Sequence, residues 1–305
     1  MGMLSVLSRA ACFIAIIFLG YFLRRVGFFK AEDFQVLSKI VLKITLPAAI
    51  VFSFADKEID PSMLVISLLG LAAGVVYIGV AFLMGIGRPK EQNAFGILNT
   101  SGYNIGNFTL PFVQSFLGPA GVVVSSLFDS GNAIICLGGA YSVATIVKGE
   151  GKGIPVAQIL RTLLKSVPFD AYLVMTVLCL LGMRLPQPVV TFSEIIAGGN
   201  AFMAMLMIGV GFKLSGDKAQ IGTIGRILAV RYGIAVVFSM VMYFLLPMPL
   251  EYRQTLAILA FAPISSAAPA FTADLKSDTG LASAVNSVSI IISICCIVGV
   301  VSLVL

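Results

Sequence analysis

Apolar segments long enough to cross a bilayer dominate this chain, and short polar stretches separate them. A helical crossing needs about 20 apolar residues, because the hydrocarbon core is about 30 Å thick. This length predicts ten spans, over residues 4–23, 34–54, 63–86, 92–116, 120–147, 166–183, 189–212, 227–246, 253–274 and 281–304. The first is interpreted as a span and not as a signal peptide, since it has full membrane length and lacks a small-residue cleavage site. The pattern therefore predicts an all-α polytopic membrane protein.

Polar, proline-bearing stretches interrupt two of these spans. Residues 101–111 read Ser-Gly-Tyr-Asn-Ile-Gly-Asn-Phe-Thr-Leu-Pro, and residues 263–269 read Pro-Ile-Ser-Ser-Ala-Ala-Pro. A broken helix is tolerated in a membrane only where protein or a water-filled cavity satisfies the freed backbone groups. A matching pair of breaks, in spans four and nine, therefore predicts a transport site.

The basic residues of the loops predict the orientation of the spans. Alternate loops contain 13 and 3 Lys or Arg residues, and the richer loops should be cytoplasmic. The richer set is Arg24, Arg25, Lys30, Arg88, Lys90, Lys148, Lys152, Arg161, Lys165, Lys213, Lys218, Arg226 and Lys276. Both termini are then extracytoplasmic, and the protein is expected in the cell (plasma) membrane, which is the inner membrane in a bacterium.

The longest connection divides the spans into two sets of five. Residues 1–147 form the first set, residues 148–165 a cytoplasmic linker, and residues 166–305 the second set. An odd number of spans per half makes the second half enter from the opposite face, so we predict two inverted repeats whose broken fourth spans cross near the bilayer midplane.

Composition narrows the function. The chain is 59% hydrophobic and 11% charged, with a formal charge of +6 that is scattered through short loops, so a nucleic-acid partner is not expected. It has no histidine, no paired cysteine motif and no complete phosphate-binding loop, which argues against a metal site, a bound cofactor and a nucleotide motor. No span or loop gathers a base, a nucleophile and metal ligands, so we expect a gradient-driven process and not an enzyme.

The two interruptions supply the candidate substrate site. Asn104, Asn107 and Thr109 precede Pro111, which is suited to the first turn of a restarted helix. In the second interruption Ser265 and Ser266 precede Pro269, with Thr272 one turn further on. Two helix N-termini that converge at mid-membrane would favour an anion such as a carboxylate. The alternative is a pair of proline kinks repaired by neighbouring helices, with Gly102 and Gly106 as a packing motif.

Ionisable and polar residues inside the spans add further candidates. Asp129 and Asn132 share a helix face and could bind Na⁺ or a proton, pair with a basic residue, or cap a polar network. Lys43 lies deep enough in span two to reach an anion pathway, whereas Arg231, one turn inside span eight, reads as an interfacial anchor. Asn286 would be a polar neighbour of the crossing or a helix–helix hydrogen-bonding residue.

At these residues the chain resembles the auxin efflux carrier family, which includes bacterial permeases for malonate and other organic acids. The most specific match is Asn104, Gly106 and Pro111 in span four. Supporting features are Leu46-Pro47-Ala48, Asp129, Asn132, the proline-bearing ninth span, and the tail 281–285 that leads to Ile292-Ser293. Two positions depart from the family pattern: Thr109 replaces a frequent glycine, and Asn200 lies near a frequent proline of span seven.

The resemblance implies a secondary transporter with a scaffold of spans 1, 2, 6 and 7 and a moving transport unit of spans 3–5 and 8–10. It implies elevator-type alternating access and a small carboxylate substrate such as malonate, malate or an auxin-like acid. It also implies a homodimer formed through scaffold spans. The fold is similar to that of bile-acid sodium symporters, so a Na⁺- or H⁺-coupled symporter remains an alternative, as does a passive anion channel.

Overall fold

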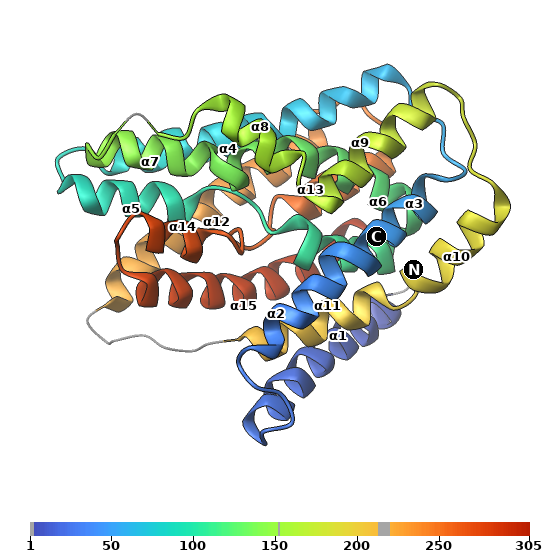
Figure 1. Cartoon of the computed structure of the whole chain (residues 1–305), viewed down its shortest axis with the longest axis horizontal. Coiled ribbons are helices and arrows are strands. Elements are labelled where there is room, and N and C mark those ends of the chain that lie inside the picture. The colour runs from blue at the N-terminus through green and yellow to red at the C-terminus, as the bar shows by residue number, and fades with distance from the viewer. Residues whose placement is uncertain (1–2, 152, 213–219) are drawn as a thin grey trace.

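The computed structural model describes residues 3–151, 153–212 and 220–305; Lys152, Lys213 and Lys218 of the loop count lie outside the described residues. Regular secondary structure in these ranges is entirely helical, which confirms the all-α prediction (Figure 1). The helices up to the middle of the chain are α1 (Met3–Arg25), α2 (Asp33–Ile40), η1 (Val41–Thr45), α3 (Leu46–Phe54), η2 (Pro61–Leu64), α4 (Val65–Met84), α5 (Lys90–Thr100), η3 (Ile105–Thr109), α6 (Leu110–Ile134), η4 (Ile135–Gly139) and α7 (Ala140–Lys148). The remaining helices are α8 (Val156–Leu163), α9 (Val167–Leu180), α10 (Gln187–Ala197), α11 (Asn200–Gly211), α12 (Ile221–Phe244), α13 (Leu250–Leu259), α14 (Ala268–Asp274) and α15 (Thr279–Val304).

Several of these helices are long and apolar enough to cross a membrane. Within the described ranges there are seven such helices, or eight if α8 and α9, which meet at a bend of 81°, form one span. One continuous stretch, 105–148, has 44 residues, about twice the length that a single crossing needs. Gly118 breaks it with a non-helical backbone of positive φ (φ 60°, ψ −153°), between the predicted spans 92–116 and 120–147. The protein is thus a multi-pass membrane protein, and the division into ten crossings stays a prediction.

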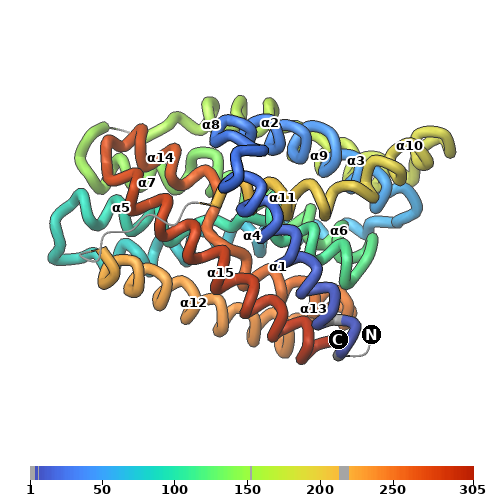
Figure 2. Tube along the Cα trace, turned by 90° about the horizontal axis from the view of Figure 1, so that it is seen from below, coloured from blue at the N-terminus to red at the C-terminus, as the bar shows by residue number. Residues whose placement is uncertain are grey.

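The two ends of the chain lie close together. Figure 1 and Figure 2 both place the first turn of α1 beside the last turn of α15. The first and last helices are therefore neighbours, and the side of the membrane on which the termini lie stays a prediction.

Glycines let two pairs of helices approach until their backbones touch. A Cβ atom on Gly20 of α1 would lie 2.4 Å from the carbonyl oxygen of Leu206, and one on Gly209 of α11 would lie 2.0 Å from that of Ile17. The α4–α6 pair repeats this contact, because a Cβ on Gly70 would lie 2.0 Å from the carbonyl oxygen of Phe128. Such close backbone packing is the usual association mode of membrane helices.

The α4–α6 contact predicts that Gly70→Ala destabilises the protein. Alanine normally stabilises a helix relative to glycine by up to about 1 kcal/mol, but here its methyl group must displace a backbone carbonyl, which costs about 1–3 kcal/mol or more. Gly79 on the same helix faces open space and is the matched control. Thermal unfolding in detergent should show a lower Tm for Gly70→Ala than for Gly79→Ala; equal values would contradict this packing.

Candidate functional site

The two interrupted segments meet backbone to backbone. Tyr103, between α5 and η3, forms an isolated antiparallel bridge with Ile264, between α13 and α14. The backbone N–H of Asn104 donates to the carbonyl oxygen of Pro263 at 2.9 Å. Gly102 allows this geometry, because its φ of +76° is strained for other residues and an added Cβ would lie 2.8 Å from Cys136 Sγ. Residues some 160 positions apart in the chain are thereby joined at one point.

Two asparagines satisfy the backbone groups that the interruptions free. The Asn132 side chain on α6 accepts from the Tyr103 N–H and donates to the Tyr103 carbonyl oxygen, both at 2.9 Å. It therefore replaces a peptide partner at the broken helix. Asn286 on α15 donates to the carbonyl oxygens of Ile264 and Ser265, at 3.2 and 3.0 Å, and so supports the second interruption. Each polar break is thus repaired by the following long helix, as intramembrane backbone requires.

Arg231 on α12 lies under the crossing, so its prediction as an interfacial anchor is wrong. Its side chain is 1% exposed. The guanidinium donates to the carbonyl oxygens of Thr100, Ala262 and Pro263, at 2.5, 2.8 and 3.0 Å. It also lies 5.2 Å from the ring centroids of both Tyr77 and Tyr103. The carbonyls at the ends of α5 and α13 carry negative partial charge, which explains why a cation is stable there.

The first interrupted helix restarts earlier than the sequence suggests. Pro111 was expected to begin the new helix, but a π-helical turn, η3, begins at Ile105 and runs directly into α6. Its first turn is closed by Thr109, whose N–H and Oγ1 both donate to the Asn104 carbonyl oxygen at 3.3 Å. Thr109 is fully buried, and Pro111 lies in the first turn of α6, so both shape the helix and neither lines the cavity described next.

A cavity of about 110 Å³ opens beside the crossing. Its walls come from both interruptions, from α6 and η4, from η1 and the start of α3, and from the start of α9. Polar atoms are supplied by Tyr103, Asn104, Asn107, Asp129, Asn132, Cys136, Ser166, Tyr172, Ser265 and Ser266. Six of the predicted site and network residues therefore lie around one space.

The N-terminus of η3 faces this cavity, and the side-chain amide of Asn104 lies beside it without a hydrogen-bond partner among the described residues. Ile105, Gly106 and Asn107 line the wall, and the first N–H groups of a helix have no intrahelical acceptor. The Asn104 side chain lines the same wall and has no hydrogen-bond partner within the described residues. Asn107 Nδ2 donates to Ser266 Oγ at 3.3 Å, which links the two interruptions at the rim. This corner of the cavity is rich in hydrogen-bond donors.

Asp129 also lines the cavity, close to the start of η3: a Cβ atom added to Gly106 would lie 3.5 Å from its Oδ2. It accepts from Asn132 Nδ2 at 2.8 Å and from Tyr172 Oη at 3.0 Å. Tyr172, on α9, and Ser166, which precedes that helix, were missed in the sequence analysis. Ser166 with Pro168 is a helix-start signal, but nothing in the sequence indicates that this start faces the interruptions.

The remaining predicted residues lie outside the cavity wall. Lys43 in η1 is exposed, although Leu42 and Leu46 beside it line the cavity. Pro269 lies in the first turn of α14, and Thr272 is buried and accepts from Asn99 Nδ2 at 3.2 Å. Asn200 is also structural: it accepts from Thr45 Oγ1 at 3.0 Å and donates to Gln114 Oε1 at 3.1 Å, which ties η1 and α11 to α6.

Comparison with known proteins finds a family match for the first half of the chain. The model of a family described as membrane transport protein matches residues 6–153, a range that includes the first interruption, Asp129 and Asn132. No curated protein matches the chain at a significant level.

Proposed function

The chain belongs to the membrane transport protein family, whose model its residues 6–153 match, and we propose that it is a secondary carrier of small carboxylates. The match confirms the resemblance to auxin efflux carriers that the sequence suggests. The protein is therefore a membrane transporter, in agreement with the expectation that it is not an enzyme.

The observation that carries the choice of substrate is the free amide of Asn104 beside the η3 N-terminus. A carboxylate there would accept from the Asn104 amide and from unsatisfied backbone N–H groups, as anions do at helix N-termini. Asn107 and Ser266 would complete the contact from the other side. A cavity of about 110 Å³ holds roughly eight waters, which favours short mono- and dicarboxylates over auxin-like aromatic acids.

The position of the cavity supports alternating access by an elevator movement. Its lining residues come partly from predicted scaffold spans, through Leu42, Leu46 and Tyr172, and partly from the predicted transport unit around the crossing. Asn132 and Asn286, each on the fifth span of its half, bind the interruption of the preceding span, as an inverted repeat would arrange them. We propose two repeats, 1–147 and 166–305, joined by 148–165, with both termini extracytoplasmic and a scaffold-mediated homodimer in the cell membrane.

Counterflow tests the carrier function against a passive channel. Proteoliposomes that contain the protein and a high internal concentration of unlabelled malonate should take up external radiolabelled malonate several-fold faster than empty proteoliposomes. A carrier that has exported an unlabelled molecule can return with a labelled one, so internal substrate speeds up uptake. A channel has no such exchange step, so internal substrate does not speed up its uptake. Uptake that internal malonate does not accelerate would exclude the carrier and favour the channel.

Asp129 favours a variant of this function in which carboxylate transport is coupled to the transport of Na⁺ or H⁺. Two negative charges about 5–6 Å apart repel each other by about 3 kcal/mol at an effective dielectric constant of about 20, so a carboxylate in the cavity wall disfavours a bound anion. Binding of Na⁺ or a proton at Asp129 would remove that repulsion and couple the two gradients. Imposed Na⁺ and pH gradients on the same proteoliposomes would test this, and flux independent of both would leave Asp129 as part of a polar network.

A further inference from the structure

A second cleft, away from the central cavity, brings two arginines together. It lies between the end of α4, the length of α5 and the start of α12, and Arg88, Gln92, Gly96, Thr100 and Arg226 are among its lining residues. None of its lining residues is shared with the central cavity, and none comes from the predicted scaffold spans. It is therefore a separate cleft within the predicted transport unit.

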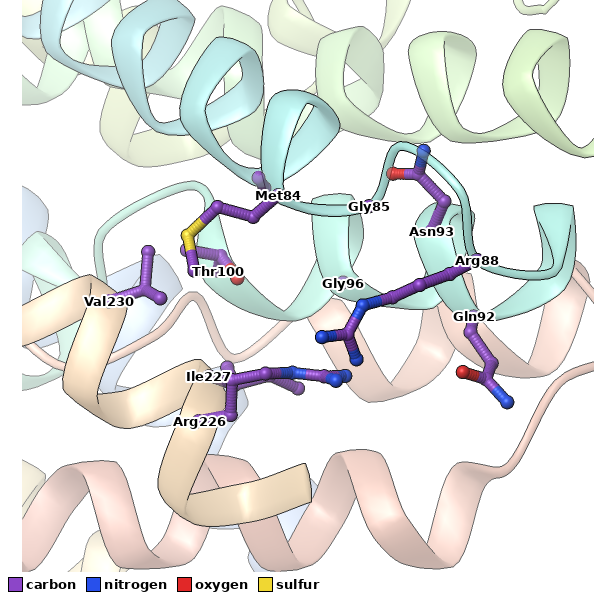
Figure 3. A pocket seen from close by; sticks show the side chains of 11 residues that line it. Met84, Gly85, Arg88, Gln92, Asn93, Gly96, Thr100, Arg226, Ile227 and Val230 are labelled. Atoms are coloured by element: carbon purple, nitrogen blue, oxygen red, sulfur yellow. The ribbon is translucent and has the colours of Figure 1, made fainter. Parts of the chain in front are cut away.

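The local backbone directs the Arg88 side chain into this cleft. A turn after α4, with Gly87 in the left-handed region, ends in the hydrogen bond from the Arg88 N–H to the Gly85 carbonyl oxygen. Figure 3 shows the Arg88 side chain returning over Gly96 of α5 toward Arg226, so that the two guanidinium groups point toward one another. A Cβ atom added to Gly96 would meet no atom within 4 Å, so this part of the cleft is open space.

The two guanidinium groups lack a counter-ion. Neither has a hydrogen-bond or ion-pair partner within the described part of the chain, and the ion pair found there joins Lys148 to Glu150. Two like charges that converge without a partner attract an anion, and arginine forks match the geometry of phosphate oxygens. The cleft volume of about 30 Å³, room for roughly two waters, suits a single phosphate group and not a whole nucleotide.

The surroundings of the cleft match a membrane interface. Arg88 follows a transmembrane helix, and Arg226 lies in the second turn of α12. Leu83 and Ile86 beside Arg88 are more than half exposed, with relative accessibilities of 63% and 64%. Apolar residues next to paired arginines at the predicted cytoplasmic surface are suited to an anionic lipid. We propose that Arg88 and Arg226 form a binding site for a phosphate group, supplied by an anionic phospholipid headgroup or by free phosphate.

Thermal-shift titration of the purified full chain in detergent tests the site, because a ligand that binds the native state raises Tm by mass action. One arm uses short-chain phosphatidylglycerol, with short-chain phosphatidylcholine, a zwitterion of no net charge, as the comparison, and the other uses inorganic phosphate. The variants are Arg88→Gln, Arg226→Gln and their double, and Arg161→Gln, an exposed arginine of α8, is the matched control. Gly96→Val keeps both charges and fills the cleft.

We expect phosphatidylglycerol to raise the Tm of the wild type and of Arg161→Gln. The double variant and Gly96→Val should need at least about tenfold more lipid for the same shift. If only inorganic phosphate gives an arginine-dependent shift, the site stands and its ligand is soluble. Shifts that are equal in all variants, or shifts that phosphatidylcholine produces as strongly as phosphatidylglycerol, with none from inorganic phosphate, would overturn the phosphate site. Native mass spectrometry of retained phosphatidylglycerol repeats the comparison for any variant with a low starting Tm.

Discussion

Aspartate in place of Asn104 is expected to abolish carboxylate uptake while the protein stays folded. The change keeps the size of the side chain, removes its N–H donors and places a negative charge in the proposed substrate site. Repulsion and the lost hydrogen bond together should lower uptake at least about 100-fold, since a hydrogen bond to a charged group alone contributes about 1.5–3 kcal/mol. Asn104→Ala, which removes the donor without adding charge, should lower uptake about tenfold.

The hydrogen bonds by which Asn104 supports the fold are made by its backbone, so a side-chain substitution tests substrate binding separately from folding. Its backbone N–H donates to Pro263, and its carbonyl oxygen accepts from Thr109, and both bonds survive any side-chain change. The Tm of Asn104→Ala should therefore stay close to that of the wild type, whereas Asn104→Asp, which adds a carboxylate to the cavity that Asp129 lines, should lower the Tm without preventing folding. Gln187→Glu, the same amide-to-acid change at an exposed position at the start of α10, controls for added charge. Wild-type uptake by Asn104→Asp in proteoliposomes would remove Asn104 from the substrate site.

The interruptions could be predicted because the residues that cause them lie close together in the sequence. A run with Asn104, Asn107 and Pro111 inside an apolar span has no stable place in a lipid-exposed helix, so the sequence alone indicates a break. Asp129 and Asn132 were found for a similar reason, since polar groups are costly at a helix centre and share a face at i, i+3. The site residues that the sequence identifies are those that violate the apolar pattern.

The partners of these residues could not be predicted, because tertiary packing selects them. Tyr172 reads as an ordinary aromatic residue of an apolar span, and only the approach of α9 brings its hydroxyl to Asp129. The restart at Ile105 depends on a π turn, a local choice that proline at 111 permits but does not specify. For Lys43, the sequence predicts how deep the residue lies along its span but not which face of the helix it occupies. Its neighbours Leu42 and Leu46 line the cavity, and Lys43 does not.

Arg231 was misread because position along a helix does not reveal what covers it. One turn inside a span, a long cationic side chain ordinarily reaches the interface. Here the ends of α5 and α13 approach α12 and present carbonyl groups that have lost their own helical partners. The broken helices that the sequence predicts therefore leave carbonyl groups that need a buried cationic donor. The sequence does not show which basic residue supplies it.

Arg231→Met is expected to prevent the crossing from forming a stable structure. Replacing a buried ion pair with apolar side chains can be neutral when both partners are removed, but the partners of Arg231 are backbone carbonyls, which remain. Pro263 would still accept from Asn104, whereas the carbonyls of Thr100 and Ala262 would lose the donor that now satisfies them. Each unsatisfied buried acceptor costs about 1–3 kcal/mol, so we expect a loss of about 3 kcal/mol or more.

Thermal unfolding and size-exclusion chromatography in detergent would measure this loss. Arg231→Lys should fall between Arg231→Met and the wild type, because an ammonium group keeps the charge but cannot reproduce the guanidinium fork or its contact with the Tyr77 and Tyr103 rings. Arg184→Met, at an exposed arginine beyond α9, should behave like the wild type. A Tm for Arg231→Met within error of the wild-type value would mean that the carbonyls find other donors. The crossing would then be held by the Tyr103–Ile264 bridge and by Asn132 and Asn286 alone.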